Sequence, residues 1–216
     1  MHEITRKVAE LCAAGAALAR NEFWLAGGAL LLLFGAGVAS DLLGSGGTVI
    51  GAVVQLLLQW SLFRHVARRE GWIGEGNPTG GVFGLIGMGI VKTPGVLLAC
   101  LLLLLPGLYL TARWSASSAI LVAEDATVMD ALAASWNRTR SSGVAIALTL
   151  CGIYLPVMVV LGGIVFWSDP DAETTLAETL PMNAAIAWAT VAGWYLALAV
   201  YDRTRTPQVE LEQVFA

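Results

Sequence analysis

Long apolar stretches, separated by short polar segments, dominate the pattern of residues along this chain. A helix needs about 20 apolar residues to cross a hydrocarbon core of about 30 Å, and several stretches approach or exceed that length. Barrel strands would instead alternate polar and apolar residues, and 97-LLACLLLLL-105 does not alternate. We therefore expect an all-α, polytopic membrane helical bundle of about six transmembrane helices in a single domain, residues 1–216. The expected spans are about 23–43, 47–63, 82–105, 107–123, 143–167 and 182–201.

Two further segments have the periodicity of amphipathic helices. Residues 3–20 place apolar side chains at helical spacing and charged side chains elsewhere on the helix. Residues 127–140 do the same, and Thr127 and Asp130 have the spacing of an N-terminal capping pair. We expect both segments to be helices that lie at the membrane interface, one before the first span and one before the fifth.

Two prolines interrupt the apolar region of the third and fourth spans. Pro106 marks the expected turn between them. Thr93 and Pro94 have the pattern of a helix start, with Thr as the cap and Pro at the first helical position. A helix from Pro94 to about residue 112 would leave only 114–123 for the return, and ten helical residues rise only about 15 Å. We therefore interpret Pro94 as a kink or break inside the third span.

Composition and charge agree with a membrane protein and predict its orientation. The chain is 57% hydrophobic and only 13% charged, whereas about a quarter of residues are charged in a typical soluble domain. With six crossings, ten of the 12 Lys and Arg residues fall on one side of the membrane: Arg6, Lys7, Arg20, Arg64, Arg68, Arg69, Arg138, Arg140, Arg203 and Arg205. Basic residues concentrate in cytoplasmic loops, so we expect both termini to be cytoplasmic.

The other two basic residues, Lys92 and Arg113, fall inside expected spans. A charge at such a depth costs about 3 kcal/mol on insertion scales, so each needs a partner. Glu124 lies eleven residues after Arg113, a rise of about 16 Å, which is too far for a direct pair. Three kinds of partner remain: backbone carbonyls freed by a proline, a lipid phosphate, or an anionic ligand. The candidate lipid or ligand contacts are Lys92, Pro94, Pro106, Tyr109 and Arg113.

Motifs for catalysis, metal or cofactor binding are not found in the sequence. There is no HExxH, GxSxG or P-loop pattern, and Cys12, Cys100 and Cys151 are scattered. The acidic loop 168–181 could bind a divalent cation weakly, but we interpret it as a solvated outer loop that obeys the charge rule. His65 stands beside a basic cluster and is interpreted as a topology or head-group residue. We predict no catalytic residue, no metal site and no cofactor.

A dispersed motif resembles a known bacterial family. It runs Pro106-Gly107-Leu-Tyr109-Leu-x-x-Arg113, then Glu124, then Ala131-Leu132-x-x-Ser135-Trp136-x-x-Thr139-Arg140. This run resembles the membrane domain attached to some glycerophosphoryl diester phosphodiesterases, and it is similar to the small YciC-type inner-membrane proteins. Arg138 and Ser141 stand where the pattern has leucine and glycine, and the resemblance covers residues 85–165 best. It implies a bacterial six-helix bundle with two interfacial helices and implies no chemistry, since the diesterase activity would belong to a separate barrel.

Two hypotheses of function follow. The first is a non-enzymatic protein of the bacterial inner membrane, a scaffold or lipid-interacting envelope protein. The alternative is a small transporter, or a transporter subunit, for an anionic substrate or lipid. Membrane lipids, and possibly another membrane protein, are the expected partners, and nucleic acid is not. A transporter should have a polar cavity, reachable by water, that touches Lys92 or Arg113. A scaffold should instead have packed helices and a flat or grooved lipid-facing surface.

Overall fold

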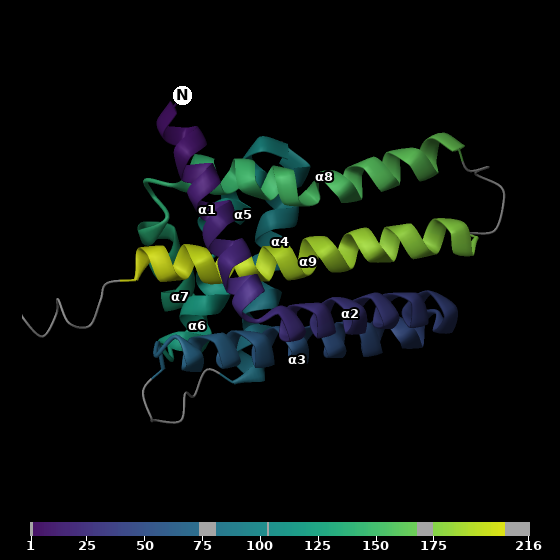
Figure 1. Cartoon of the computed structure of the whole chain (residues 1–216), viewed down its shortest axis with the longest axis horizontal. Helices are drawn as coiled ribbons and strands as arrows, with labels where there is room; N and C mark the ends of the chain where they lie inside the picture. Colours follow the sequence, from purple (N-terminus) through teal and green to yellow (C-terminus); the bar gives the residue numbers. More distant parts are fainter. Residues whose placement is uncertain (1, 74–80, 103, 168–174, 206–216) are drawn as a thin grey trace, which may run out of the picture.

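The computed structural model describes residues 2–73, 81–102, 104–167 and 175–205, and within these ranges the chain is helical with no strand. This confirms the all-α class (Figure 1). The helices are α1 (His2–Asn21), α2 (Phe23–Leu43), α3 (Ser45–Arg69), α4 (Val82–Leu102), α5 (Leu104–Arg113), α6 (Ser117–Ala123), α7 (Val128–Arg138), α8 (Gly143–Trp167) and α9 (Leu176–Thr204).

Helix α9 is the centre of the bundle. It contacts α1, α2, α3, α6 and α8. In the most apolar 18-residue stretch of α9, 67% is buried inside the molecule. In the corresponding stretches of α2, α3, α4 and α8, at most 22% is buried. Residues 194–201 form a continuous buried run, so this part of α9 is covered on all sides. Its many alanines let neighbouring helices approach closely.

The outer helices present apolar side chains to their surroundings. Leu31 of α2, Phe83 and Leu101 of α4, and Val165 of α8 are all strongly exposed. By length and composition, five of the described helices can cross a membrane: α2, α3, α4, α8 and α9. Because a soluble protein rarely exposes so continuous an apolar surface, this surface supports a helical bundle solvated by lipid.

The expected fourth span, 107–123, is not one continuous helix, and this prediction was wrong. Helix α5 ends at Arg113, and α6 begins at Ser117. The carbonyls released at this break find other partners. Ser135 Oγ donates to the carbonyl of Arg113 at 2.8 Å, and Lys92 Nζ donates to that of Trp114 at 2.9 Å. Such partners remove the cost of leaving buried carbonyls unpaired.

Both prolines also lie differently from the expectation. Helix α4 continues through Pro94, so the predicted break there is absent. Pro106 lies in the first turn of α5. Backbone N–H groups in the first turn have no acceptor within the helix, so a proline there removes no helical hydrogen bond. Helix α4 is described as far as Leu102 and α5 from Leu104, and residue 103 between them lies outside the described residues, so the predicted end of the third span at 105 stays a prediction.

The α2–α3 hairpin is closed by small residues. Gly44 adopts a φ of 64°, which L side chains rarely take. At Gly47, a Cβ would lie 2.5 Å from the Cα of Ser40, so only glycine allows the two helices to pack this closely. Ser40 Oγ donates hydrogen bonds to the carbonyls of Ala36 and Gly47, both at 2.8 Å. In Figure 1 this hairpin lies beside α9.

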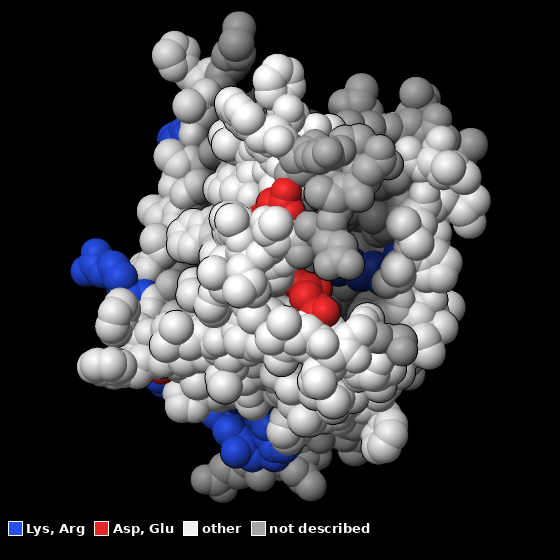
Figure 2. All heavy atoms as spheres, turned by 90° about the vertical axis from the view of Figure 1, so that its right-hand side faces the viewer, with Lys and Arg blue, Asp and Glu red and all other residues white. Residues whose placement is uncertain are grey.

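Charged contacts gather at the end of the bundle where α3 and α9 finish. Arg203 of α9 pairs with Glu10 of α1 at 2.9 Å. Arg69 at the end of α3 pairs with Glu22, between α1 and α2. Figure 2, which views the opposite end, shows a mostly uncharged face with acidic side chains near its middle, basic atoms in a recess, and further basic side chains at the left and lower edges of the view. Arg69 and Arg203 thus lie at one end of the bundle, and the sorting of ten basic residues to one side of a membrane stays a prediction.

Candidate functional site

Residues of the dispersed motif come together where α5 meets α7. The carbonyl of Arg113 ends α5 and accepts hydrogen bonds from Ser135 Oγ at 2.8 Å and from Thr139 Oγ1 at 3.1 Å. Ser135 and Thr139 are fully buried, as is Ala131 on the same helix face. The side chains of α7 therefore complete the broken helix, which gives the motif a structural explanation.

The side chain of Arg113 lies between two aromatic rings. Its Cζ is 4.4 Å from the ring centroid of Trp136 and 5.9 Å from that of Tyr109. Only 2% of Arg113 is exposed, and among the described residues its Nε and Nη1 find no hydrogen-bond acceptor. A desolvated cation–π contact is worth about 2 kcal/mol or more. This partner was not predicted from the sequence, where Trp136 entered only as a residue of the dispersed motif.

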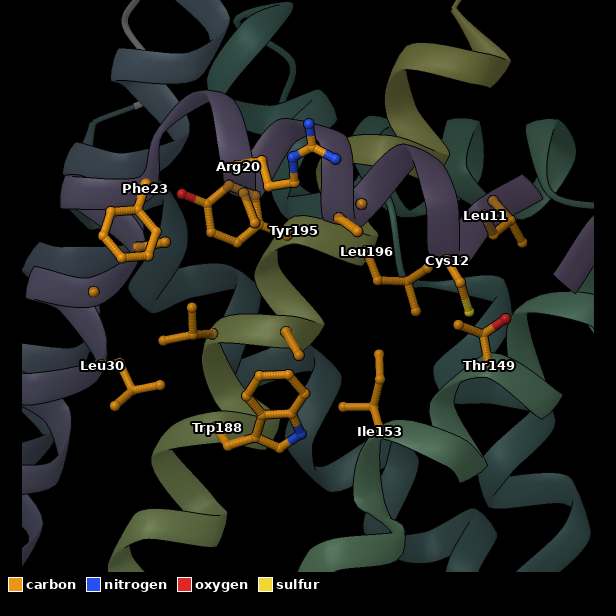
Figure 3. A pocket seen from close by; sticks show the side chains of 17 residues that line it. Leu11, Cys12, Arg20, Phe23, Leu30, Thr149, Ile153, Trp188, Tyr195 and Leu196 are labelled. Carbon is orange, nitrogen blue, oxygen red and sulfur yellow. The ribbon is translucent and has the colours of Figure 1, made fainter. Parts of the chain in front are cut away.

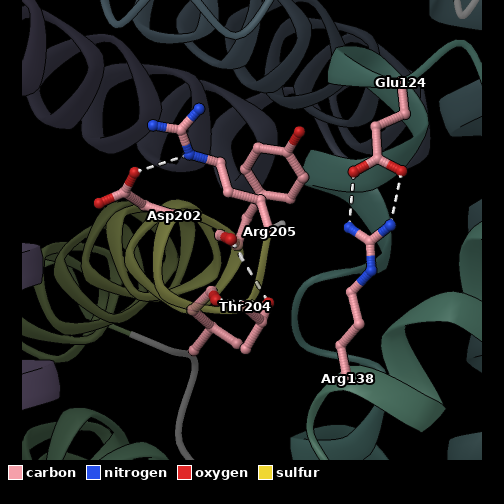
Figure 4. A network of polar contacts seen from close by, with 7 residues as sticks. Glu124, Arg138, Asp202, Thr204 and Arg205 are labelled. Atoms are coloured by element: carbon pink, nitrogen blue, oxygen red, sulfur yellow. Dashed lines mark hydrogen bonds and ion pairs between the residues drawn. The ribbon is translucent and has the colours of Figure 1, made fainter. Parts of the chain in front are cut away.

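Glu124 and Arg138 form a bidentate ion pair (Figure 4). Arg138 Nη1 donates to Glu124 Oε1 at 2.5 Å, and Nη2 donates to Oε2 at 2.8 Å. The hydrogen bonding of Arg138 to the carboxylate of Glu124, which favours the charged guanidinium, raises the pKa of Arg138. The pair connects the end of α6 to the end of α7. Arg138 therefore supplies a partner for Glu124 at a position where the resembling pattern has leucine.

The end of α9 lies beside this pair, as Figure 4 also shows. Arg205 Nε donates to Asp202 at 3.1 Å, and its guanidinium lies 5.4 Å from the ring of Trp72. Trp72 in turn packs edge-on against Tyr201, with ring centroids 5.0 Å apart. These contacts place residue 72, after α3, and Glu124, after α6, at the same end of the bundle. Helices α4, α5 and α6, which lie between these two positions in the chain, therefore lead away from this end of the bundle and back to it.

Lys92 lines a polar cavity of about 210 Å³ that opens to the surface, since Gln55 and Tyr154 in its lining are exposed. The cavity lies between α3, α4, α8, α9 and the break between α5 and α6. Its polar side chains are Gln55, Gln59, Lys92, Thr111, Ser115, Ser118, Tyr154 and Thr190. Arg113 and Tyr109 line neither this cavity nor the one described next, and Pro94 and Pro106 are exposed on the outside. Of the predicted contact residues, Lys92 is therefore the one that lines either of these two cavities.

A second, larger cavity of about 480 Å³ lies beneath α1 (Figure 3). Its walls come from α1, α2, α8 and α9, and its lining is almost entirely apolar. In Figure 3, α1 crosses above the pocket, while Leu30, Ile153 and Trp188 line its deeper part. Helix α1 packs closely on α9 here, since a Cβ at Gly15 would make an ordinary contact with the backbone of Tyr195 at 3.7 Å.

Two polar groups stand near α1 at this pocket. Arg20 is exposed and forms no ion pair with any residue the structure describes. Tyr195 is 2% exposed, and its hydroxyl lacks a hydrogen-bond partner within the described ranges. Arg20 was predicted only as one of the basic residues on the cytoplasmic side, and Tyr195 was not predicted as a site residue. Arg20 and Tyr195 lie close together because α1 crosses α9. The pattern of residues within either helix does not predict this crossing.

Fold and cavities together define an all-α helical bundle of the integral membrane class. No protein-family model, curated protein or solved structure compared with this chain matches it. The resemblance to the phosphodiesterase-linked membrane domains and the YciC-type proteins therefore stays a prediction. In the described ranges no group of three or more His, Cys, Asp or Glu side chains is placed to hold a metal ion.

Proposed function

We propose that this chain is a non-enzymatic, lipid-binding protein of the bacterial inner membrane, with both termini in the cytoplasm. The observation that carries the proposal is the apolar pocket beneath α1, with Arg20 and Tyr195 near its interfacial side. The occupant would be a phospholipid, with one acyl chain in the pocket and its phosphate toward Arg20. The resemblance to YciC-type proteins fits this location.

The surroundings of the pocket favour an acyl chain as the occupant. An empty apolar cavity loses the dispersion contacts of its walls, and something apolar must restore them. Helices α2 and α8 bear strongly exposed leucine and valine side chains, so the pocket lies in a lipid-facing part of the molecule. A bilayer supplies acyl chains at high concentration there, whereas water gains nothing from entering an apolar site.

Selectivity would come from the polar end of the pocket. An acyl chain gains little on moving from bilayer lipid into an apolar groove, because both environments are equally apolar. A guanidinium binds phosphate through paired hydrogen bonds, and Arg20 has its donors available. The hydroxyl of Tyr195 can donate to an ester or phosphate oxygen. We therefore expect a preference for anionic phospholipids.

A pair of glycines on α2 allows a matched test of the pocket. Gly27 lines the pocket and Gly28 does not, and a Cβ at either position meets no atom within 4 Å. Gly27→Leu should fill the cavity and lower several-fold the phospholipid that copurifies with the protein, measured by mass spectrometry after purification in mild detergent. Gly28→Leu should leave that amount unchanged. Equal lipid content in the two variants would contradict the proposal.

The head-group contact is tested at Arg20. One basic residue near an anionic surface contributes about 1 kcal/mol, so Arg20→Gln should lower the retention of anionic lipid about fivefold. Arg68→Gln is the control, because Arg68 is also exposed but lies away from the pocket. A preference for anionic lipid that survives Arg20→Gln would show that the phosphate binds elsewhere.

A further inference from the structure

The polar cavity at Lys92 is lined by one positively charged side chain and by no negatively charged one. Its lining residues include Lys92 but no Asp or Glu. A cation inside the membrane is costly and is normally paired or bonded to carbonyls. Lys92 Nζ donates to the carbonyl of Trp114 at 2.9 Å. An ammonium has three N–H donors, so two of them are left for the cavity.

Other donors converge on the same space. Ser115 Oγ is buried and has no hydrogen-bond partner among the described residues. Gln55 and Gln59 lie four residues apart on α3 and therefore share one face of that helix. Tyr154 of α8 and Thr190 of α9 contribute hydroxyls from the opposite helices. A ligand that accepts several hydrogen bonds and carries negative charge would satisfy these groups together.

We propose that this cavity binds a small monocarboxylate. A single lysine balances one negative charge, and the cavity lacks the arginine fork that suits a phosphate. Its volume of about 210 Å³ is several times the roughly 30 Å³ that one water occupies, which leaves room for a short organic acid. The site is separate from the apolar pocket, with Leu196 as the one residue that lines both.

The test measures thermal unfolding of the whole purified chain in detergent with increasing sodium acetate, against sodium chloride at equal ionic strength. A ligand that binds only the folded state raises Tm with its concentration, by about 2–4 °C at roughly five times Kd. We expect this rise with acetate and not with chloride. Lys92→Met should abolish it, since the side chain keeps its length and loses its charge.

A second pair of glycines keeps the test independent of Lys92. Gly193 lines the cavity and Gly163 does not, and a Cβ at either position meets no atom within 4 Å. Gly193→Leu should fill the cavity and remove the acetate-dependent rise, while Gly163→Leu should retain it. The proposal is overturned if wild type shows no rise up to 100 mM acetate, if chloride gives an equal rise, or if Gly193→Leu responds as wild type does.

Discussion

The guanidinium of Arg113 and the indole of Trp136 are stacked, with Cζ 4.4 Å from the ring centroid. Arg113 ends α5, and Trp136 belongs to α7, so the contact joins two helices across a break in the chain. It explains how a basic residue within an apolar region is held without a carboxylate. The electron-rich face of the indole attracts the guanidinium and stabilises its positive charge.

Replacing the indole tests this contact. Trp136→Leu should lower the free energy of unfolding by about 2 kcal/mol, and Trp136→Phe should lower it less, because a smaller ring still faces the cation. Denaturation in detergent, followed by circular dichroism, measures the change. Trp24→Leu is the control, since Trp24 is 87% exposed and packs only against Phe23 in the ring contacts described. Equal losses at the two positions would argue against a special role for Trp136.

The hydroxyls of Ser135 and Thr139 should stabilise the end of α5. Together they bond the carbonyl of Arg113, and their loss leaves a buried acceptor without a partner. We expect Ser135→Ala combined with Thr139→Val to cost about 2–3 kcal/mol of unfolding free energy. Thr149→Val should cost clearly less, because the hydroxyl of Thr149 bonds only the carbonyl of Ala145 in its own helix. A comparable loss at Thr149 would mean that helix capping is not the cause.

Gly107 should be intolerant of any side chain. A Cβ there would lie 2.1 Å from Cys100 Sγ and 2.9 Å from the backbone nitrogen of Cys100, so α4 and α5 would have to separate. Gly107→Ala should therefore lower stability by about 1–3 kcal/mol, as overpacking does. Gly89→Ala, where a Cβ meets nothing within 4 Å, should be neutral or slightly stabilising. Thermal unfolding of both variants decides between these outcomes.

The proposed orientation is tested with reporter fusions. Reporters at residues 45 and 175 should be active in the periplasm, because these positions begin α3 and precede α9 at the end of the bundle that has few basic residues. A reporter after residue 205 should be cytoplasmic. A cytoplasmic signal at 45 or 175 would overturn the orientation deduced from the Lys and Arg residues.

Local signals in the sequence predicted the amphipathic helices well. The segment expected at 127–140 is α7, 128–138, and Thr127 caps it by accepting a hydrogen bond from the backbone nitrogen of Asp130 at 3.3 Å. The segment expected at 3–20 is α1, 2–21. Periodicity and capping act within a few residues, so a sequence displays them directly. That these helices lie at the membrane interface stays a prediction.

Long-range contacts account for what the sequence did not predict. The break after Arg113 depends on Ser135, which lies 22 residues further along, and hydropathy alone makes 107–123 appear continuous. The partner of Glu124 is Arg138, fourteen positions away on another helix. Part of the acidic loop at 168–181 and the end of the polar tail fall outside the described residues. The two cavities depend on how several helices pack, and no single segment reveals them.

The central position of α9 has a consequence for how the molecule is made. The ribosome releases α1, α2, α3 and α8 before α9, yet each of them packs against it. During synthesis these helices lack their common partner until α9 is inserted, although α2 and α3 can already pack against each other. Assembly of the bundle is thus a late event, and both cavities come into being only when α9 supplies their last wall.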